Sequence, residues 1–189
     1  MRAAFFDLDK TILGTTSSLA FTRPLYEQGM LKRADVVRSA YQQFLFSTGA
    51  ADHAQMERMR EYLSALVTGW DVEQLTNIVL ETLNDRITPT VHLEALELIA
   101  SHRAAGRDVI IVSASGSEIV HPVAELLGAT DAIATKLEVF NGKYTGAITF
   151  YAYGENKAKA IREYAGTHGY DLSQCFAYSD SMTDLPMLE

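Results

Sequence analysis

A short apolar run near the N-terminus leads directly into two carboxylates, and this arrangement already points to a sheet. Ala3–Phe6 has the character of a buried strand, and Asp7 and Asp9 follow it two residues apart. In open α/β sheets, ligands bind at the carboxyl ends of the strands. Neighbouring carboxylates can hold a hard divalent cation, and one of them can act as a nucleophile. The alternative is a solvated turn, because Asp is common in turns.

Later segments repeat the pattern of an apolar run followed by polar groups. The run 107–112 ends at Ser113, the run 176–178 ends at Ser179 and Asp180, and Lys157 stands at the start of a helical segment. Taken alone, each has an ordinary explanation as a turn, a helix cap or a solvated lysine. Because the carboxyl ends of parallel strands meet at one edge of a sheet, we expect these groups to converge there.

The pattern of apolar residues over 15–86 is typical of helices. Apolar residues recur at three- and four-residue spacing over 31–48 and over 52–68, which is typical of amphipathic helices. Asp71 is an expected N-cap for the next helix, with Gln74 three residues later. We predict that residues 15–86 form a helical cap domain that packs on itself.

Strands alternate with helices in the rest of the chain. We expect a helix that starts at Thr88-Pro89 and ends before Gly106, a strand to Val112, and a helix that ends at Gly128. A short strand at 132–135, a hairpin with an Asn141-Gly142 turn, a helix at 155–168 and a strand at 175–178 follow. This order predicts an α/β fold with a doubly wound, mostly parallel sheet. Its core would comprise residues 1–14 and 87–189, with the cap inserted between them.

With these motifs in order, the chain resembles the haloacid dehalogenase-like superfamily, in its phosphoserine-phosphatase-like branch. Asp7, Asp9 and Thr11 match the DxDxT motif, and Ser113 matches the hydroxyl of the second motif. Lys157 matches the lysine of the third motif, where spacing favours it over Lys159. The remaining match is the acidic pair of the fourth motif, Asp180 and Asp184.

The resemblance implies a Mg²⁺-dependent phosphomonoester hydrolase that works through an aspartyl phosphate. Asp7 would be the nucleophile and Asp9 the general acid and base. Mg²⁺ would be held by Asp7, the backbone carbonyl of Asp9, and Asp180. Asp184 would lie behind these ligands or bind the ion through water, and Thr11 would orient the loop. Groups expected to bind the phosphoryl oxygens are Ser113, Lys157, and the backbone amides of Leu8 and Ala114.

Substrate recognition is the weakest part of the resemblance. Phosphoserine phosphatases carry a Glu shortly after DxDxT, whereas residues 14–18 here include no acid. We expect Thr15, Thr16 and Ser17 to bind a polar or sugar-like leaving group. The candidate anchors for a substrate carboxylate are Arg58, Arg60 and Arg86. The alternatives are phosphoserine phosphatase proper, with Glu27 or Glu57 as the acid, and a non-catalytic scaffold that binds phosphate or a metal ion.

Composition narrows the class of partner. The chain has 189 residues, 48% of them hydrophobic and 21% charged, as in ordinary globular proteins. A net charge of −8 argues against nucleic acid or an anionic membrane as partner. The partner that the resemblance implies is a small phosphorylated metabolite. The single cysteine, Cys175, cannot form an internal disulfide, and the N-terminus does not resemble a signal peptide. We therefore expect a cytoplasmic protein.

The C-terminal boundary at Glu189 also carries an expectation. Members of the branch continue with a further strand and helix beside the strand that bears the fourth motif. Without them, the strand at 175–178 would have an unpaired edge, which folded proteins generally avoid. We therefore expect either a shortened chain, which we favour, or another element that covers this edge.

Overall fold

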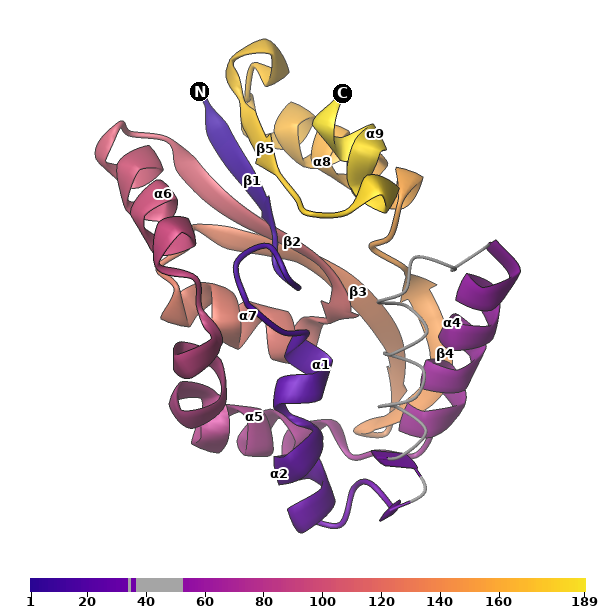
Figure 1. Ribbon diagram of the computed structural model, residues 1–189. Coiled ribbons are helices and arrows are strands. Elements are labelled where there is room, and N and C mark those ends of the chain that lie inside the picture. Colours follow the sequence, from indigo (N-terminus) through magenta and orange to yellow (C-terminus); the bar gives the residue numbers. More distant parts are fainter. Residues whose placement is uncertain (34, 37–52) are drawn as a thin grey trace.

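The computed structural model describes residues 1–33, 35–36 and 53–189, with the side chains of residues 53–59 outside that description. A five-stranded sheet in the order β4-β3-β2-β1-β5 lies at its centre (Figure 1). Four of these strands run parallel and β4 runs antiparallel to β3, which confirms the mostly parallel sheet. The strand bounds are β1 Ala3–Asp7, β2 Asp108–Gly116, β3 Asp131–Phe140, β4 Lys143–Phe150 and β5 Phe176–Tyr178.

Helices precede, separate and follow these strands. The α-helices are α1 Ser17–Ala20, α2 Thr22–Glu27, α4 His53–Val67, α5 Val72–Ile87, α6 Leu93–Ala104, α7 Ser117–Leu126, α8 Glu155–His168 and α9 Leu185–Leu188. Three 3-10 turns lie at Thr88–Thr90, Leu172–Gln174 and Met182–Asp184. The helix expected over residues 31–48 falls largely outside the described residues.

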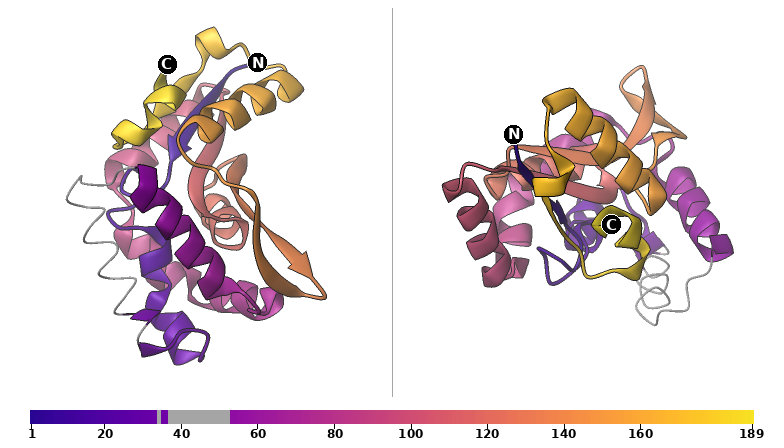
Figure 2. Two further views of the ribbon diagram at one scale, coloured as in Figure 1. Left: turned by 90° about the vertical axis from the view of Figure 1, so that its right-hand side faces the viewer. Right: turned by 90° about the horizontal axis from the view of Figure 1, so that it is seen from above.

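Side chains of the central strands alternate between two hydrophobic clusters, one on each face of the sheet. Ala4 and Phe6 of β1 join the cluster that contains residues of α6 and α7. Ala3 and Phe5 join the opposite cluster, which contains residues of α8 and Met187 of α9. The two layers of helices flank the sheet in the views of Figure 2. The period-two alternation that a strand imposes therefore produces the predicted doubly wound core.

The helices of residues 15–86 pack against the sheet domain as well as against each other. Helix α5 contacts α7, and α4 lies against β4 (Figure 1). Leu75, Val79 and Ile87 of α5 belong to the same cluster as Phe6. The N-cap of α5 forms as expected, since the Asp71 side chain accepts a hydrogen bond from Gln74 N at 3.0 Å. The division of the chain into a core and a cap stays a prediction.

The predicted helix start at Thr88-Pro89 is wrong. These residues form a 3-10 turn, and α6 begins at Leu93. The segment between them is bonded to the loop after β1. Gly14 N donates to Thr90 O at 2.7 Å, and His92 N donates to Ile12 O at 2.9 Å. These long-range bonds hold the backbone extended and outweigh the local helix signal.

The hairpin prediction is confirmed, with one change. Asn141 and Gly142 connect β3 to β4 and have φ values of 49° and 75°, as a tight hairpin turn requires. The short strand expected at 132–135 and the first arm of the hairpin are, however, one continuous strand, β3.

No helix within the described residues is both long and apolar enough to span a membrane.

Candidate active site

The chain turns sharply where β1 ends, and this turn holds the acidic motif at the edge of the sheet. Asp7 is the last residue of β1. Ile12 N and Leu13 N both donate to Leu8 O at 3.0 Å, and Lys10 takes the left-handed conformation with φ of 68°. The loop therefore folds back over the carboxyl end of β1.

Lys157 lies at the centre of the site. Its Nζ is 2.5 Å from Asp7 Oδ1 and 2.7 Å from Asp184 Oδ2, and all three side chains are buried. Lys157 comes from the first turn of α8, whereas Lys159, two residues later on the same helix, is exposed. The structure thus brings together the expected nucleophile, the expected lysine and one acid of the fourth motif.

Thr11 links the first motif to the fourth. Its Oγ1 lies 3.0 Å from Asp7 Oδ2 and 3.0 Å from Asp180 Oδ1, and it also accepts a hydrogen bond from Asp180 N at 3.0 Å. A hydroxyl has one proton to donate, so the two carboxylates compete for it. Asp180, at the end of the loop after β5, is thereby held beside Asp7 and remains exposed to solvent.

Asp9 is held by two serines, one on each carboxylate oxygen. Ser17 N donates to Oδ1 at 2.6 Å, and Ser115 Oγ donates to Oδ2 at 3.1 Å. Ser17 Oγ in turn donates to Ser115 Oγ at 2.7 Å. Asp9 is therefore oriented by the N-terminus of α1 and by the end of β2.

Burial dominates the electrostatics of the site. It raises the pKa of Asp7 to about 6, against the opposing effect of the Lys157 ammonium. Burial also raises the pKa of Asp9, although hydrogen bonds from Ser17 and Ser115 lower it in part. For Lys157 burial lowers the pKa, but the carboxylates of Asp7 and Asp184 raise it by more.

The groups expected to bind phosphoryl oxygens lie at the same edge. Ser113 is fully buried near the end of β2, and its Oγ accepts a hydrogen bond from Ser115 N at 3.1 Å. That bond leaves the Ser113 proton available for an acceptor. The Ala114 carbonyl accepts from Thr135 Oγ1 at 2.7 Å, which fixes the peptide between Ala114 and Ser115. Leu8 is fully buried directly after Asp7.

The donor set fits a hard divalent cation. Among the described residues joined by these bonds, four are carboxylates and one is an ammonium. The described residues contain no group of three His, Cys, Asp or Glu side chains at metal-binding distances. The predicted set requires only two, Asp7 and Asp180, with the Asp9 carbonyl as the third ligand. Mg²⁺ accepts such a set, because it keeps several water ligands.

The residues expected to contact substrate lie in different environments. Thr15 and Thr16 are half-buried, and Thr16 caps α1. Ser17 is fully buried and bonded to Asp9, so in this structure it supports the acid rather than facing solvent. Arg58 belongs to α4, but its side chain is outside the described part of the chain. Their roles toward substrate stay predictions.

The structure gives contacts in the site to two serines for which the sequence predicted no role. Ser115 contacts Asp9, and Ser179 Oγ donates to Asp184 Oδ2 at 2.8 Å. Each lies within two residues of a motif residue, at the carboxyl end of β2 or β5. Their closeness in sequence to Ser113 and Asp180 was the signal that could have indicated both serines.

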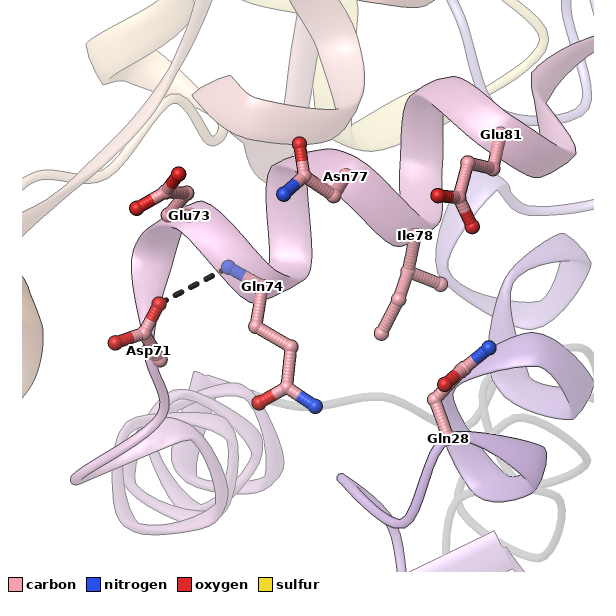
Figure 3. Close-up of a pocket in the computed structure, with 7 residues that line it drawn as sticks. All are labelled: Gln28, Asp71, Glu73, Gln74, Asn77, Ile78 and Glu81. Carbon is pink, nitrogen blue, oxygen red and sulfur yellow. Dashed lines mark hydrogen bonds between the residues drawn. The ribbon is translucent and has the colours of Figure 1, made fainter.

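A separate pocket of about 340 Å³ lies between α2 and α5 (Figure 3). Its lining is acidic and polar and consists of Gln28, Asp71, Glu73, Gln74, Asn77, Ile78 and Glu81. None of these residues belongs to the network around Asp7. The pocket therefore contributes nothing to the site.

Comparison with known proteins places this geometry in a family. The model of the haloacid dehalogenase-like hydrolases matches residues 4–189. A probable phosphatase of Mycobacterium tuberculosis is 58% identical over 187 residues, which cover 99% of this chain and 65% of that protein. A phosphoserine phosphatase of the same organism is 32% identical over 188 residues, which cover 98% of this chain and 61% of that protein.

The fold is also found among solved structures. A crystal structure of phosphoserine phosphatase in its apo form superposes with a TM-score of 0.66 at 22% identity, over 98% of this chain and 80% of that one. This likeness concerns the fold. The chain spans about two thirds of the length of the curated relatives it matches. A family model that covers nearly all of its residues shows that the chain belongs to the haloacid dehalogenase-like hydrolase family.

Proposed function

We propose that the protein is a Mg²⁺-dependent phosphatase that hydrolyses a small phosphorylated metabolite, in the cytoplasm, through an aspartyl phosphate. The contact of Lys157 with both Asp7 and Asp184 carries this proposal, together with the Thr11 bridge to Asp180. A carboxylate can attack a phosphate dianion only where positive charge offsets the repulsion. The names of the relatives support the same reaction class.

In the first half of the reaction, a carboxylate oxygen of Asp7 attacks phosphorus and the bond from phosphorus to the leaving oxygen breaks. Asp9 gives its proton to that oxygen, so the product leaves as an alcohol. In the second half, Asp9 takes a proton from water, whose oxygen attacks phosphorus. The bond from phosphorus to Asp7 then breaks and inorganic phosphate is released. The raised pKa of Asp9 suits a group that must both give and take a proton.

The other residues bind and neutralise. Asp7, Asp180 and the backbone carbonyl of Asp9 would hold Mg²⁺, which supplies charge neutralisation to the phosphoryl group. Lys157, the Ser113 hydroxyl, and the amides of Leu8 and Ala114 would hold the phosphoryl oxygens. Thr11 and Asp184 would hold Asp180 and Lys157 in place, as their hydrogen bonds suggest.

The substrate would be read by the segment 15–86, which we propose as the cap. Thr15 and Thr16 stand beside the site, and their hydroxyls suit a polar leaving group. Phosphoserine phosphatase proper is the second candidate, favoured by the relative of that name. The absence of an acid at residues 14–18 argues against it.

Turnover of p-nitrophenyl phosphate tests the proposed activity. We expect hydrolysis that requires Mg²⁺, stops with EDTA, and is lost in Asp7→Asn. Beryllium fluoride should inhibit by capping Asp7. Hydrolysis that persists in Asp7→Asn would refute the aspartyl phosphate, and a protein without any turnover would be a phosphate- or metal-binding scaffold. A screen of phosphorylated metabolites that includes phosphoserine then identifies the substrate.

A further inference from the structure

The hydrogen bonds around Asp9 single out a residue that the proposed reaction does not yet use. Ser115 Oγ lies 3.1 Å from Asp9 Oδ2, although 106 positions separate the two residues in the chain. Ser115 is half-buried near the end of β2, where the pairing of β2 with β3 shifts in register between Ser113 and Gly116. The irregularity lies in the stretch of β2 that carries Ser115.

We infer that Ser115, supported by Ser17, is a positioning residue that fixes the Asp9 carboxylate for proton transfer to the leaving group. This inference rests on the proposed function. It adds a residue outside the motifs and assigns it to one step of the reaction.

The direction of the hydrogen bonds follows from the groups involved. An ionised carboxylate only accepts, so the single proton of Ser115 Oγ points to Asp9. Ser17 Oγ must then be the donor in its 2.7 Å bond to Ser115 Oγ. The Ser17 amide, which can only donate, binds the other Asp9 oxygen at 2.6 Å. One donor on each oxygen leaves the carboxylate little freedom to rotate.

The same contacts join two parts of the chain around one acid. Ser17 opens α1, at the start of the segment that we propose as the cap, and Ser115 belongs to the sheet. Ser17 is fully buried, so the pair is packed against its surroundings. A loss of the Ser115 hydroxyl removes one of the two bonds that orient Asp9, without touching Asp7, Lys157 or Asp180.

Leaving groups of different stability reveal this role. An alkoxide needs a proton to depart, whereas p-nitrophenolate is a stable anion and departs without one. We expect Ser115→Ala to lower kcat/KM for β-glycerophosphate by about 10- to 100-fold, the usual range for a misplaced catalytic group. For p-nitrophenyl phosphate, kcat/KM should change by less than about threefold. A purely structural role would lower both values equally.

A double-mutant cycle ties the effect to Asp9. In an Asp9→Asn background, Ser115→Ala should cause no further loss with β-glycerophosphate, because the group it positions is already gone. Ser117→Ala is the matched control, since this nearby hydroxyl donates to Thr135 O and not to Asp9. Thermal unfolding of each variant checks that it is folded. Should Ser115→Ala fail to fold, Ser17→Ala should give a smaller loss with the same selectivity.

The possible results of these experiments distinguish a failure of the role of Ser115 from a failure of the proposed phosphatase function. Equal losses for both substrates, no loss for either, or losses that add in the cycle would overturn the role of Ser115 and leave the phosphatase intact. A wild-type protein that hydrolyses neither substrate would overturn the proposed function and this inference with it. A selective, non-additive loss supports both.

Discussion

The ammonium of Lys157 forms ion pairs with two buried carboxylates, and these contacts make Lys157 central to the charge balance of the site. Taking a charge out of water is costly unless a partner compensates for it. Here Asp7 and Asp184 compensate the ammonium, and the ammonium in turn holds the two acids close together. The same residue type two positions later, Lys159, is exposed and makes no comparable contribution.

Lys157→Ala should therefore damage both activity and stability. It leaves buried carboxylates without their cation, a change that typically costs about 3–5 kcal/mol. We expect a lower free energy of unfolding in denaturant titrations. We also expect a fall of about 100-fold or more in kcat/KM for p-nitrophenyl phosphate. Lys159→Ala is the control and should leave both unchanged, whereas equal effects of the two substitutions would contradict the assignment.

Where strands and helices meet, a buried histidine joins several elements. His102 of α6 is 4% exposed and packs on Phe6 of β1. Arg107 Nε, which can only donate, lies 2.7 Å from His102 Nδ1, just before β2. Nδ1 must then be the acceptor, so Nε2 carries the proton and lies 2.9 Å from Tyr178 Oη of β5. The packing of these elements therefore requires a neutral ring.

The neutral ring predicts a loss of stability in mild acid. Burial lowers the pKa of His102 in the folded protein, and the charge of Arg107 lowers it further. The unfolded chain, with a pKa of about 6.5, binds the proton first as the pH falls. The contribution of His102 to the free energy of unfolding is thus complete above about pH 6.5. It is lost as the pH falls toward the pKa of His102 in the folded protein.

Unfolding of the wild type and of His102→Gln between about pH 8 and 5 checks this prediction. Gln is neutral throughout, so the variant should lose less stability on acidification, by about 1.4 kcal/mol for each tenfold difference in proton affinity. Asp7 acts in the opposite direction, because its folded pKa is raised to about 6 and protonation favours the folded state. Both proteins contain Asp7, so the comparison isolates His102. Parallel pH profiles would contradict the prediction.

Across the whole molecule, the sheet gathers acidic residues from distant parts of the chain. The protein carries a net charge of −8, and the ends of β1 and β5 bring Asp7 and Asp180 to one hydroxyl. The described cluster contains four carboxylates and one ammonium group, and the Mg²⁺ that we propose would reduce the repulsion between the carboxylates. Folding and metal binding should therefore be linked.

Added Mg²⁺ should raise the thermal stability of the protein. A ligand that binds only the folded state stabilises it by about 2.7 kcal/mol at a free concentration of 100 times its Kd. We expect a higher Tm with Mg²⁺ than with EDTA. The increase should be much smaller in Asp180→Asn, because this substitution removes a proposed Mg²⁺ ligand that is exposed to solvent and leaves the core intact. An equal increase in the variant would place the ion elsewhere.

Local signals in the sequence predicted much of this architecture. The alternation of apolar runs with helical segments predicted the doubly wound sheet. Asp71 predicted the start of a helix, and Asn141-Gly142 predicted the hairpin turn. Each of these signals is local, because periodicity, caps and turn residues act over a few positions. The order of Asp7, Ser113, Lys157 and Asp180 also indicated which chain segments would meet.

The tertiary structure decided what depends on contacts between distant segments. Hydrogen bonds to the loop after β1 held Val91 and His92 extended and moved the start of α6 to Leu93, against the local helix signal. Ser115 and Ser179 gained their partners because the fold brings the end of β2 close to Asp9 and the loop after β5 close to Asp184. A sequence determines which groups are available at a strand end. Only the packed backbone determines which of them come within about 3 Å of one another, the distance on which hydrogen bonds and charge pairing depend.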